Sequence, residues 1–351
     1  MDTAVVILNF NGKHWLEKFL PNVIENTPDA RIIVADNASS DDSVAFMLQQ
    51  FPEIELIQLK ENTGYAGGYN EALKQVDAQY YMLLNSDIEV TPNWLKPLVN
   101  CLEEHPEIAA IQPKILNHGQ KSHFEHAGAS GGFIDYLGYP FCRGRVFSEL
   151  EEDKAQYQNP SYCFWATGAC LLVRAQDFWK AGALDADFFA HMEEIDLCWR
   201  LQLLGKSSAV LPSSIVYHVG GGTLNQLSPT KTYLNFRNNL FMLFKNLPRH
   251  KLLPVIFFRM VLDGVAGIKF ILGLQIRHFF AILKAHTHFY LALRKLRKKR
   301  KLVANKRSLS TMNGVLKKSL VLHYFVKGVK TFNKLAYGLD RPFKKASKAN
   351  S

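Results

Sequence analysis

Polar side chains that could bind a phosphate or a metal ion follow each of the first four apolar segments of this 351-residue chain. Taken one at a time, such groups are typical of turns, because turns prefer Asn, Asp, Gly and Ser. Four in succession favour a different interpretation, in which they line one shared binding site. The residues concerned are Asn9, Asn11, Asp36, Asn37, Asn62, Gly64, Asn70, Asn85, Ser86 and Asp87.

Asp87 and His218 are the candidate metal ligands. Asp87 follows a strongly apolar segment, and a carboxylate there is suited to a Mn²⁺ or Mg²⁺ ion whose other ligands are phosphate oxygens. The alternative is an Asx turn without a metal. His218 ends a later apolar segment and precedes Gly220, Gly221 and Gly222, which permit a ligand to approach the backbone closely. A lone histidine is more often structural, so its assignment depends on a metal at Asp87.

Three carboxylates, Glu193, Glu194 and Asp196, lie at the start of an expected helix over residues 191–205. The spacing of Asp196 and Arg200 also fits a solvated helix face with one ion pair. However, most of the following helix is apolar, which predicts that the acids are partly buried. Crowded, buried carboxylates raise one another's pKa. A carboxylate of this kind is suited to act as a general base near neutral pH.

Short apolar segments alternate with helical ones through the first half of the chain. This alternation predicts an α/β fold with a mostly parallel sheet, whose strand ends meet at one edge and carry the polar groups. A second block adds strands over 168–176 and 207–218, whereas residues 117–163 show no clear period and are interpreted as a variable insert. In the first block the expected strands are 4–10, 31–37, 54–60 and 79–87, and the helices 12–26, 40–51 and 67–76.

The composition excludes several classes of protein. Hydrophobic residues make up 48% of the chain, which excludes wholesale disorder. Five scattered cysteines without a CxxC pair argue against a disulfide scaffold or a zinc site and favour reduced thiols in a cytosolic setting. No signal peptide is expected, because the first apolar run is too short. The glycine motifs of nicotinamide dehydrogenases and of P-loop proteins are absent.

The charge is concentrated at one end of the chain. The formal net charge is +11, but residues 294–351 carry +17 and the rest of the chain −6. This basic part begins with the cluster 294–301, which is suited to bind anionic lipid. A nucleic acid partner is not expected, because the cluster directly follows an apolar amphipathic segment.

That apolar segment, residues 252–274, is long enough to cross a bilayer. On a helix with about 100° between successive residues, the charged residues of this segment and two charged residues beyond it fall within one sector of about 120°. A charged stripe on an apolar helix predicts a helix in the plane of the membrane, although a membrane-spanning arrangement of residues 252–293 stays open. The alternative is a buried helix of an additional helical subdomain. The stripe consists of Arg259, Asp263, Lys269, Arg277 and Lys284.

Several motifs together resemble the family 2 glycosyltransferases, in particular the bacterial subgroup labelled rhamnosyltransferase-like. The resemblance covers roughly residues 1–245, and the order and spacing of the motifs make it specific. The motifs are VVILNFNG, IIVADNASSDDS, ENTGYAGGYNEAL, LLNSDIEV, GACLLVR, FFAHMEEIDLCWRLQLLG and VYHVGGGT.

The resemblance implies a GT-A fold, which is a Rossmann-like mixed, mainly parallel sheet flanked by helices. It also implies inverting transfer from a nucleotide-diphosphate sugar. Asp36 matches the acid that reads the pyrimidine base, and Asn9 and Asn11 lie in the first nucleotide-contacting loop. The remaining strand-end residues complete the predicted nucleotide-sugar site. The donor sugar and its base, thymidine or uridine, stay open.

The resemblance further implies the metal site and the base. Residues 85–87 stand where the family has its DXD-type motif, with Asn in the first position, so Asp87 is the expected ligand of Mn²⁺ or Mg²⁺. His218 matches a histidine that completes the metal site in some relatives. Glu194 aligns with the acid of the "ED" base motif, with Glu in place of Asp. The longer side chain leaves Glu193 as a second candidate base.

We therefore expect an inverting, metal-dependent hexosyl- or deoxyhexosyltransferase that acts on a hydroxyl of a lipid-linked cell-surface glycan. The metal neutralises charge on the leaving diphosphate, and Glu194 takes the hydroxyl proton. Trp165 and Asp196 are candidates to contact the acceptor, although Trp165 fits a core aromatic equally well. The alternative is a noncatalytic sugar-nucleotide-binding or scaffold protein of a polysaccharide assembly complex. The acids at 193 and 194 argue against it, because binding alone does not need them.

The expected domains are a catalytic GT-A domain over 1–225, a connecting helix over 226–250, and an amphipathic helical, basic, membrane-associated tail over 251–351. This organisation predicts a peripheral or monotopic protein at the cytoplasmic face of the bacterial inner membrane, in contact with anionic lipid. The connecting helix carries four residues that are candidates to close the site: Tyr233, Asn235, Arg237 and Asn238.

Overall fold

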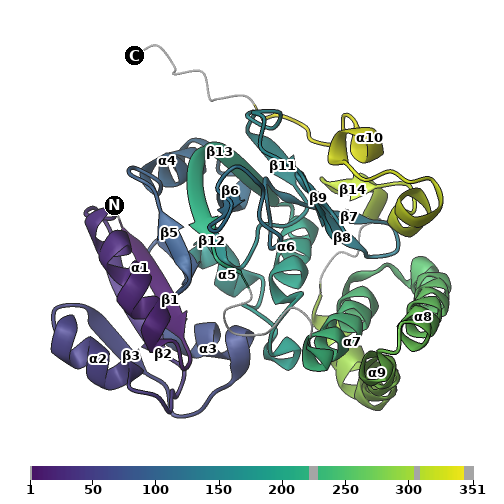
Figure 1. The fold of residues 1–351 in the computed structure, drawn as a ribbon, viewed down its shortest axis with the longest axis horizontal. Helices are drawn as coiled ribbons and strands as arrows, with labels where there is room; N and C mark the ends of the chain where they lie inside the picture. The colour runs from purple at the N-terminus through teal and green to yellow at the C-terminus, as the bar shows by residue number, and fades with distance from the viewer. Residues whose placement is uncertain (1, 221–227, 304–308, 344–351) are drawn as a thin grey trace.

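The structure is a computed structural model that describes residues 2–220, 228–303 and 309–343. Its main sheet begins with parallel strands that alternate with helices, as the sequence predicts (Figure 1). The observed bounds agree with the predicted ones to within a few residues. The strands are β1 (Thr3–Asn9), β2 (Arg31–Asp36), β3 (Glu55–Gln58) and β4 (Tyr80–Asn85), and the helices α1 (Lys13–Glu25), α2 (Ser43–Gln50) and α3 (Gly64–Leu73).

The second half of the sheet mixes strand directions. β12 (Cys170–Arg174) runs antiparallel between β4 and β6 (Ile108–Asn117), and β13 (Ser207–His218) runs parallel to β6. The strand order is β11-β13-β6-β12-β4-β1-β2-β3, with β5 (Ile88–Val90) paired to the end of β13. The expected mixed, mainly parallel sheet is confirmed. The remaining elements of this part are β11 (Ser161–Cys163), α4 (Lys96–Glu104), α5 (Ala175–Lys180), η1 (Ala186–Phe188) and α6 (Glu193–Leu203).

Burial on both faces of the sheet explains the near-continuous apolar strands. In β1, Val5 and Ile7 belong to the core that lies under α1 and α4, whereas Ala4 and Val6 belong to the core that lies under α3 and α6. The alternation follows from the pleat, which points successive side chains to opposite faces. Because both faces are covered, the strands can present polar chemistry only where they end.

Residues 117–163, which show no period in the sequence, form most of a second sheet with the strand order β10-β9-β8-β7-β14. Its last strand, β14 (Val315–Leu316), comes from near the C-terminal end of the chain and pairs with β7 (Gly132–Asp135) (Figure 1). The other strands are β8 (Pro140–Cys142), β9 (Arg145–Val146) and β10 (Glu149–Leu150).

The returning segment, residues 309–343, is anchored to this second sheet. Phe332, in α10 (Phe332–Ala336), packs against Phe133 with 4.8 Å between ring centroids. Asp340 lies 3.3 Å from the guanidinium of Arg143, which is buried. Residues 309–343 therefore pack on the globular part and do not extend from it as a separate tail. Local sequence could not indicate this return, because its partners lie far away along the chain.

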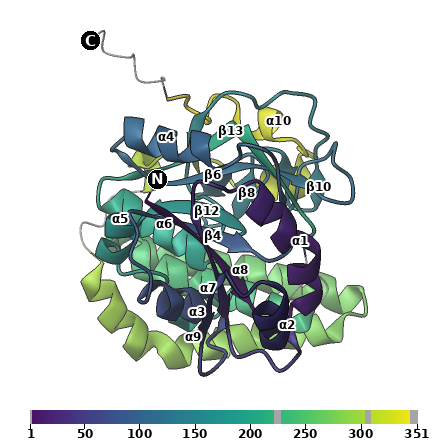
Figure 2. The ribbon, with the colours of Figure 1, turned by 90° about the vertical axis from the view of Figure 1, so that its left-hand side faces the viewer.

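A layer of helices lies beside the sheet and consists of α7 (Pro229–Asn246), α8 (Arg249–Leu272) and α9 (Ile276–Leu302) (Figures 1 and 2). α7 falls within the range predicted for the connecting helix, whose first two residues lie outside the described part of the chain. Pro248 separates α7 from α8, and Gly273 ends α8. Among the described residues, no helix combines the length and apolarity that crossing a membrane requires.

The charged stripe predicted for residues 252–293 is divided between two environments. Arg259 and Asp263 are buried, with Nε of Arg259 2.8 Å from Oδ1 of Asp263 and its guanidinium 3.7 Å from the ring centroid of Tyr139. A buried charge must be paired, and this pair satisfies that condition. The other three members of the stripe are exposed: Lys269, Arg277 and Lys284.

Candidate active site

The register of the sheet brings the predicted strand-end residues together. Asn9 pairs with Asp36 across β1 and β2, and Leu8 pairs with Asn85 across β1 and β4. The side chain of Asn9 donates a hydrogen bond to Oδ1 of Asp36 (3.0 Å), and the Ser39 amide donates to Oδ2 (2.9 Å). Both oxygens of Asp36 are thus held in place at the carboxyl edge of the sheet.

The three loops that follow β1, β2 and β3 are joined by side-chain amides. Oδ1 of Asn11 accepts a hydrogen bond from the Ser40 amide (2.7 Å). Nδ2 of Asn37 donates to Oδ1 of Asn62 (3.0 Å), and the same oxygen accepts from the Gly64 amide (2.9 Å). The predicted nucleotide-binding residues at 9, 11, 36, 37, 62 and 64 therefore form one continuous polar edge.

Position 64 requires glycine for two reasons, which are its backbone conformation and the close approach of Phe189. Its φ is +74°, and a Cβ at this position would lie 2.5 Å from Phe189. Phe189 belongs to the loop that precedes α6. The third strand-end loop and the loop that carries the candidate base are therefore in direct contact.

Asn70 does not belong to this open edge. Its Nδ2 donates to the carbonyl oxygen of Leu184 (2.7 Å), and its Oδ1 accepts from the amide of Leu184 (3.1 Å). Both polar ends of the side chain are occupied by backbone, so Asn70 holds the segment before η1. This placement argues against its predicted role in binding the donor.

Asp87 and His218 lie together, as expected for two ligands of one metal. β5 and β13 pair His218 with Ile88, which places Oδ1 of Asp87 3.1 Å from Nε2 of His218. Both side chains are buried, and Nδ2 of Asn85 lies 3.5 Å from the same nitrogen. Ser86 is half-buried in the turn beside them, whereas Gly221, Gly222 and Thr223 lie outside the described residues.

A second acidic residue, Glu125, completes this cluster and is not indicated by the sequence. Its Oε2 lies 3.2 Å from Nδ1 of His218, on the opposite side of the ring from Asp87. Burial lowers the pKa of His218, but the two carboxylates outweigh it and raise that pKa to about 10. Burial also opposes ionisation of Asp87, yet His218 holds the pKa of Asp87 below its usual value. The only local signal for Glu125 is an acid between Phe124 and His126 in a glycine-rich segment.

This donor set fits a divalent cation with open positions. In the part of the chain that the structure describes, no three His, Cys, Asp or Glu side chains converge as a complete metal cage. The protein would supply the Asp87 oxygen and the His218 nitrogen, and a diphosphate would supply the rest. One carboxylate and one imidazole suit Mn²⁺ or Mg²⁺ when phosphate oxygens complete the shell.

The two candidate bases at the start of α6 differ in their environment. Glu193 is buried and Glu194 is half-buried, and Oε2 of each is enclosed without a hydrogen-bond partner. Burial raises the pKa of Glu194 to about 7. Burial and the neighbouring Glu194 charge raise the pKa of Glu193 well above its usual value. With a pKa near neutral, Glu194 is the better suited of the two side chains to accept a proton.

Glu194 and the metal-site cluster lie near one buried thiol. Burial raises the pKa of Cys142, Arg145 opposes that rise, and the charges of Glu125 and Glu194 add to it. Both carboxylates therefore act on the same sulfur in β8. Glu125 in turn contacts His218, so the candidate base and the group beside the candidate metal ligands both lie within electrostatic range of this sulfur.

The loop before α6 has an unusual backbone. Phe189, His191 and Met192 have φ values of 64°, 69° and 73°, and the Ala190 amide donates to the Phe188 carbonyl (2.8 Å) around a γ-turn. Left-handed conformations cost free energy in residues other than glycine and occur where a site must be held in a set geometry. Phe189 is also 43% exposed, which makes it an accessible aromatic ring that the sequence motifs did not single out.

α7 holds this loop in place. Nδ2 of Asn238 lies within 2.9 Å of the carbonyl oxygens of Phe188, Ala190 and His191. Nη2 of Arg237 donates to the carbonyl oxygens of Asp187 and Phe188 at 2.9 Å each. Arg237 and Asn238, two of the residues predicted to close the site, thus fix the backbone next to Glu194.

The two candidate acceptor contacts are core residues instead. Trp165 is only 3% exposed, and its Nε1 donates to the Phe133 carbonyl (3.0 Å). Asp196 is fully buried, and its carboxylate binds Arg200 (2.8 Å), Lys245 (3.0 Å) and Asn246 (2.8 Å). This burial argues against the prediction that they contact an acceptor. Trp165 packs under the second sheet, and Asp196 ties α6 to α7.

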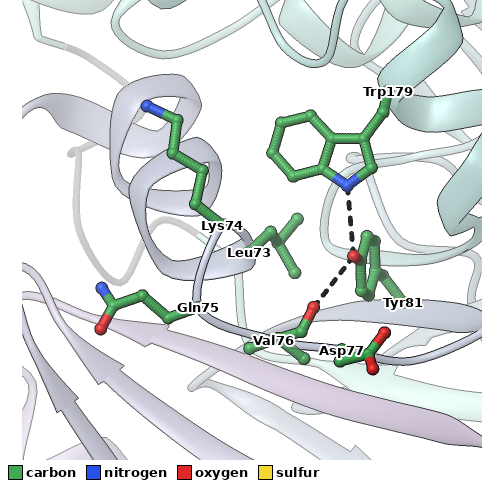
Figure 3. Close-up of a pocket in the computed structure, with 7 residues that line it drawn as sticks. All are labelled: Leu73, Lys74, Gln75, Val76, Asp77, Tyr81 and Trp179. Carbon is green, nitrogen blue, oxygen red and sulfur yellow. Dashed lines mark hydrogen bonds between the residues drawn. The ribbon is translucent and has the colours of Figure 1, made fainter.

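An open pocket at the other end of β4 lies away from these residues (Figure 3). Trp179 donates to the hydroxyl of Tyr81 (3.2 Å), which donates to the Val76 carbonyl (3.0 Å). Tyr81 lies near the start of β4, whereas Asp87 follows the end of β4. The pocket therefore lies at the opposite end of this strand from the candidate active site. None of the predicted site residues lines it. Its lining consists of Leu73, Lys74, Gln75, Val76, Asp77, Tyr81 and Trp179.

Comparison with solved structures identifies the fold. Residues 1–349 of TarS from S. aureus, in complex with UDP-GlcNAc, match with a TM-score of 0.55 at 15% identity, covering 85% of this chain and 84% of that chain. GalNAc-T7 with UDP, GalNAc and Mn²⁺ matches with a TM-score of 0.56 at 16% identity, covering 72% of this chain and 49% of that chain. The fold is that of a GT-A protein.

Sequence comparison identifies the family. The family model described as glycosyl transferase family 2 matches residues 4–180, and the chain belongs to this family. An N-acetylglucosaminyl-diphospho-decaprenol L-rhamnosyltransferase of Mycobacterium tuberculosis is 26% identical over 231 residues, which are 61% of this chain and 75% of that protein. Rhamnosyltransferase WbbL of Escherichia coli is 23% identical over 222 residues, 61% of this chain and 82% of that protein. The predicted rhamnosyltransferase-like family 2 glycosyltransferase is confirmed.

Proposed function

We propose that this glycosyltransferase is inverting and metal-dependent, and that it moves a hexosyl or deoxyhexosyl group from a nucleotide-diphosphate sugar to a hydroxyl of a lipid-linked cell-surface glycan. The observation that supports this most strongly is the presence of two candidate metal ligands in contact, Asp87 and His218, together with a carboxylate of raised pKa, Glu194, whose Oε2 has no hydrogen-bond partner.

On the donor side, Asp87 and His218 would hold Mn²⁺ or Mg²⁺, and the bound ion would neutralise charge on the leaving diphosphate. The polar edge formed by Asn9, Asp36 and their neighbours would bind the nucleoside. Two of the solved GT-A neighbours contain Mn²⁺, GalNAc-T7 and the mannosyltransferase PcManGT from Pyrobaculum calidifontis, which supports a divalent ion here.

On the acceptor side, Glu194 accepts the proton of the attacking hydroxyl. The new bond forms between that oxygen and the anomeric carbon while the bond from this carbon to the diphosphate oxygen breaks. The hydroxyl proton ends on Glu194, and the bonding electrons leave with the diphosphate. Attack on the face opposite the leaving group inverts the configuration, so no covalent sugar–enzyme intermediate is needed.

The lipid-linked acceptor is supported by the name of one relative. The name of the M. tuberculosis protein gives an N-acetylglucosaminyl-diphospho-decaprenol as its acceptor, and this is a glycan carried by a membrane lipid. We place the present enzyme at the cytoplasmic face of the bacterial inner membrane, where a soluble nucleotide sugar and a lipid-linked glycan can meet.

The test is a panel of nucleotide sugars assayed for nucleoside diphosphate release, with and without Mn²⁺, in the presence of polyprenyl-diphosphate-linked acceptors. Release that requires both metal and acceptor supports the proposal. Tight binding of one nucleotide sugar without turnover on any acceptor would instead support the noncatalytic sugar-nucleotide-binding alternative.

Glu125→Gln is expected to weaken Mn²⁺ binding about 10- to 100-fold, because carboxylates that orient a ligating histidine contribute on that scale. The change keeps the shape of the side chain but removes the charge 3.2 Å from Nδ1 of His218. Mn²⁺ titration followed by electron paramagnetic resonance measures the affinity without any transfer assay. Glu151→Gln, in a carboxylate that binds Tyr157 on the second sheet, is the matched control. Unchanged Mn²⁺ affinity in Glu125→Gln would show that Glu125 does not orient the ligand.

Asn238→Ala is expected to lower kcat at least tenfold with little change in donor affinity, because it releases three loop carbonyls next to Glu194. The loss of stability should be about 1–3 kcal/mol, as for other buried polar groups left without partners. Asn239→Ala is the matched control, since Asn239 is equally buried on α7 but donates to Gly138 on the second sheet. Equal loss of kcat in both variants would assign the effect to general destabilisation.

A further inference from the structure

α8 exposes its apolar side and buries a charged pair, Arg259 and Asp263, the reverse of a helix on the surface of a soluble protein. One stripe of large side chains runs along its outer side: Leu253, Phe257, Val261, Val265, Ile268 and Leu272. Their exposed fractions range from 50% to 81%. The stripe is about 29 Å long at 1.5 Å per residue. Contiguous apolar surfaces of this extent mark an interaction site.

The inward side of α8 carries Val255, Arg259, Asp263 and Gly267, which are buried. Arg259 and Asp263 bind each other, and His286 of α9 lies 3.2 Å from the second oxygen of Asp263. The contact of His286 with Asp263 and that of Arg259 with the ring of Tyr139 fix the rotation of α8 about its axis, so buried contacts to other elements set the outward direction of the apolar stripe.

The surface continues onto a part of the chain distant in sequence. Leu274 in the turn after α8 is 88% exposed, and Phe280 on α9 is 59% exposed. In the returning segment, Phe325 and Val326 are 55% and 73% exposed, and Nζ of Lys269 lies 5.1 Å from the ring centroid of Phe325. Two segments that meet only through the tertiary fold thus build one apolar face, defined by the α8 stripe, Leu274, Phe280, Phe325 and Val326.

The exposed charges that α8 and α9 place around the apolar face are of one sign. Between Arg249 and Leu302 the only acid is Asp263, which is buried, whereas basic residues occur along both helices. Exposed lysines and arginines flank the face at the start of α8 and at the end of α9: Arg249, Lys251, Arg294, Arg297, Lys298 and Lys301. Such a rim repels a second copy of itself but matches an anionic lipid surface.

The apolar face adjoins the active-site end of the molecule. Thr232 and Tyr233, in the first turns of α7, contact His278 (2.8 Å) and His288 (2.5 Å) of α9. Lys231, beside them, lowers the pKa of His191 in the loop before Glu194, although burial lowers it more. The start of α9, the start of α7 and the base loop are therefore neighbours, and Figures 1 and 2 show α8 and α9 as the outer layer on this side.

We propose that the apolar face is a monotopic docking surface that lies in the interface of an anionic bilayer, with α8 and the start of α9 embedded parallel to the membrane plane. Docking itself is independent of the transfer reaction. Its consequence, that a lipid-linked acceptor reaches Glu194 from the bilayer, rests on the proposed function.

The test uses the full chain and sedimentation with vesicles of phosphatidylcholine alone or mixed with phosphatidylglycerol. Wild-type protein should sediment with the anionic vesicles, and the triple variant Phe257→Ser, Val265→Ser, Leu272→Ser should bind them at least tenfold more weakly. Leu48→Ser on α2, which changes a side chain that is 58% exposed far from the face, should bind normally. Lys298→Glu with Lys301→Glu should weaken binding mainly at low salt.

Two results would overturn the proposal. One is triple-variant binding equal to that of the wild type with native circular dichroism in both. The other is a wild-type protein that ignores vesicles but dimerises in light scattering, which would assign the face to a second copy. Transfer to a water-soluble acceptor separates the two proposals. If transfer to the water-soluble acceptor persists in the triple variant while transfer to a vesicle-borne acceptor falls, both the docking surface and the proposed function are supported. If no transfer occurs but vesicle binding behaves as stated, only the proposed function is contradicted.

Discussion

Glu194→Gln is expected to lower kcat by about 10²- to 10⁴-fold, the range that a positioned general base contributes. The amide keeps the size and the buried position of the carboxylate but cannot accept a proton. Donor affinity should stay within about twofold of the wild type, because Asp87, His218 and the polar edge are unchanged. Calorimetric titration with the nucleotide sugar and Mn²⁺, together with single-turnover transfer, measures the two quantities separately.

The pH dependence provides an internal control. Because burial raises the pKa of Glu194 to about 7, kcat/KM of the wild type should rise as the pH passes upward through about 7 and fall below it, where the base is protonated. The residual rate of Glu194→Gln should lack this acid limb. Glu193→Gln should retain both the limb and most of the activity. If Glu194→Gln turned over normally and Glu193→Gln did not, the base would be Glu193.

Asp87→Ala is expected to lose both donor binding and transfer, each by at least about 10²-fold. The substitution removes the only carboxylate of the proposed metal pair and leaves His218 with a single acidic neighbour, Glu125. Mn²⁺-dependent binding of the nucleotide sugar, measured by equilibrium dialysis, reports the loss directly. The free nucleoside, which lacks the diphosphate, should bind both proteins equally, because it meets Asn9 and Asp36 and not the metal.

A structural collapse has to be separated from this effect. Asp87 is buried beside His218, so thermal unfolding of Asp87→Ala and of the isosteric Asp87→Asn should be compared with that of the wild type. If Asp87→Asn folds normally and binds the metal–donor complex as tightly as the wild type, Asp87 is not the metal ligand.

The structure also explains why the donor edge was predictable and the acceptor side was not. Asn9, Asp36 and Asp87 follow strands that are apolar because both faces are covered, so the end of each strand is visible in the local pattern. Trp165 and Asp196 sit in equally apolar surroundings, where nothing in the sequence distinguishes a side chain that faces a cleft from one that packs in a core. Their burial depends on Gly132, Lys245 and Asn246, which come from other elements.

The sequence by itself determined the strand–helix order, the polar strand ends and the acids at the start of α6, because these depend on periodicity over a few residues. Only the tertiary structure decided that Glu125 completes the cluster at His218, that the segment around β14 closes the second sheet, and that Arg259 and Asp263 turn inward. Each of these depends on contacts between residues far apart in the chain; for Arg259 and Asp263 the partners are Tyr139 and His286. The free energy of such a contact depends on burial that exists only when the distant partner is in place.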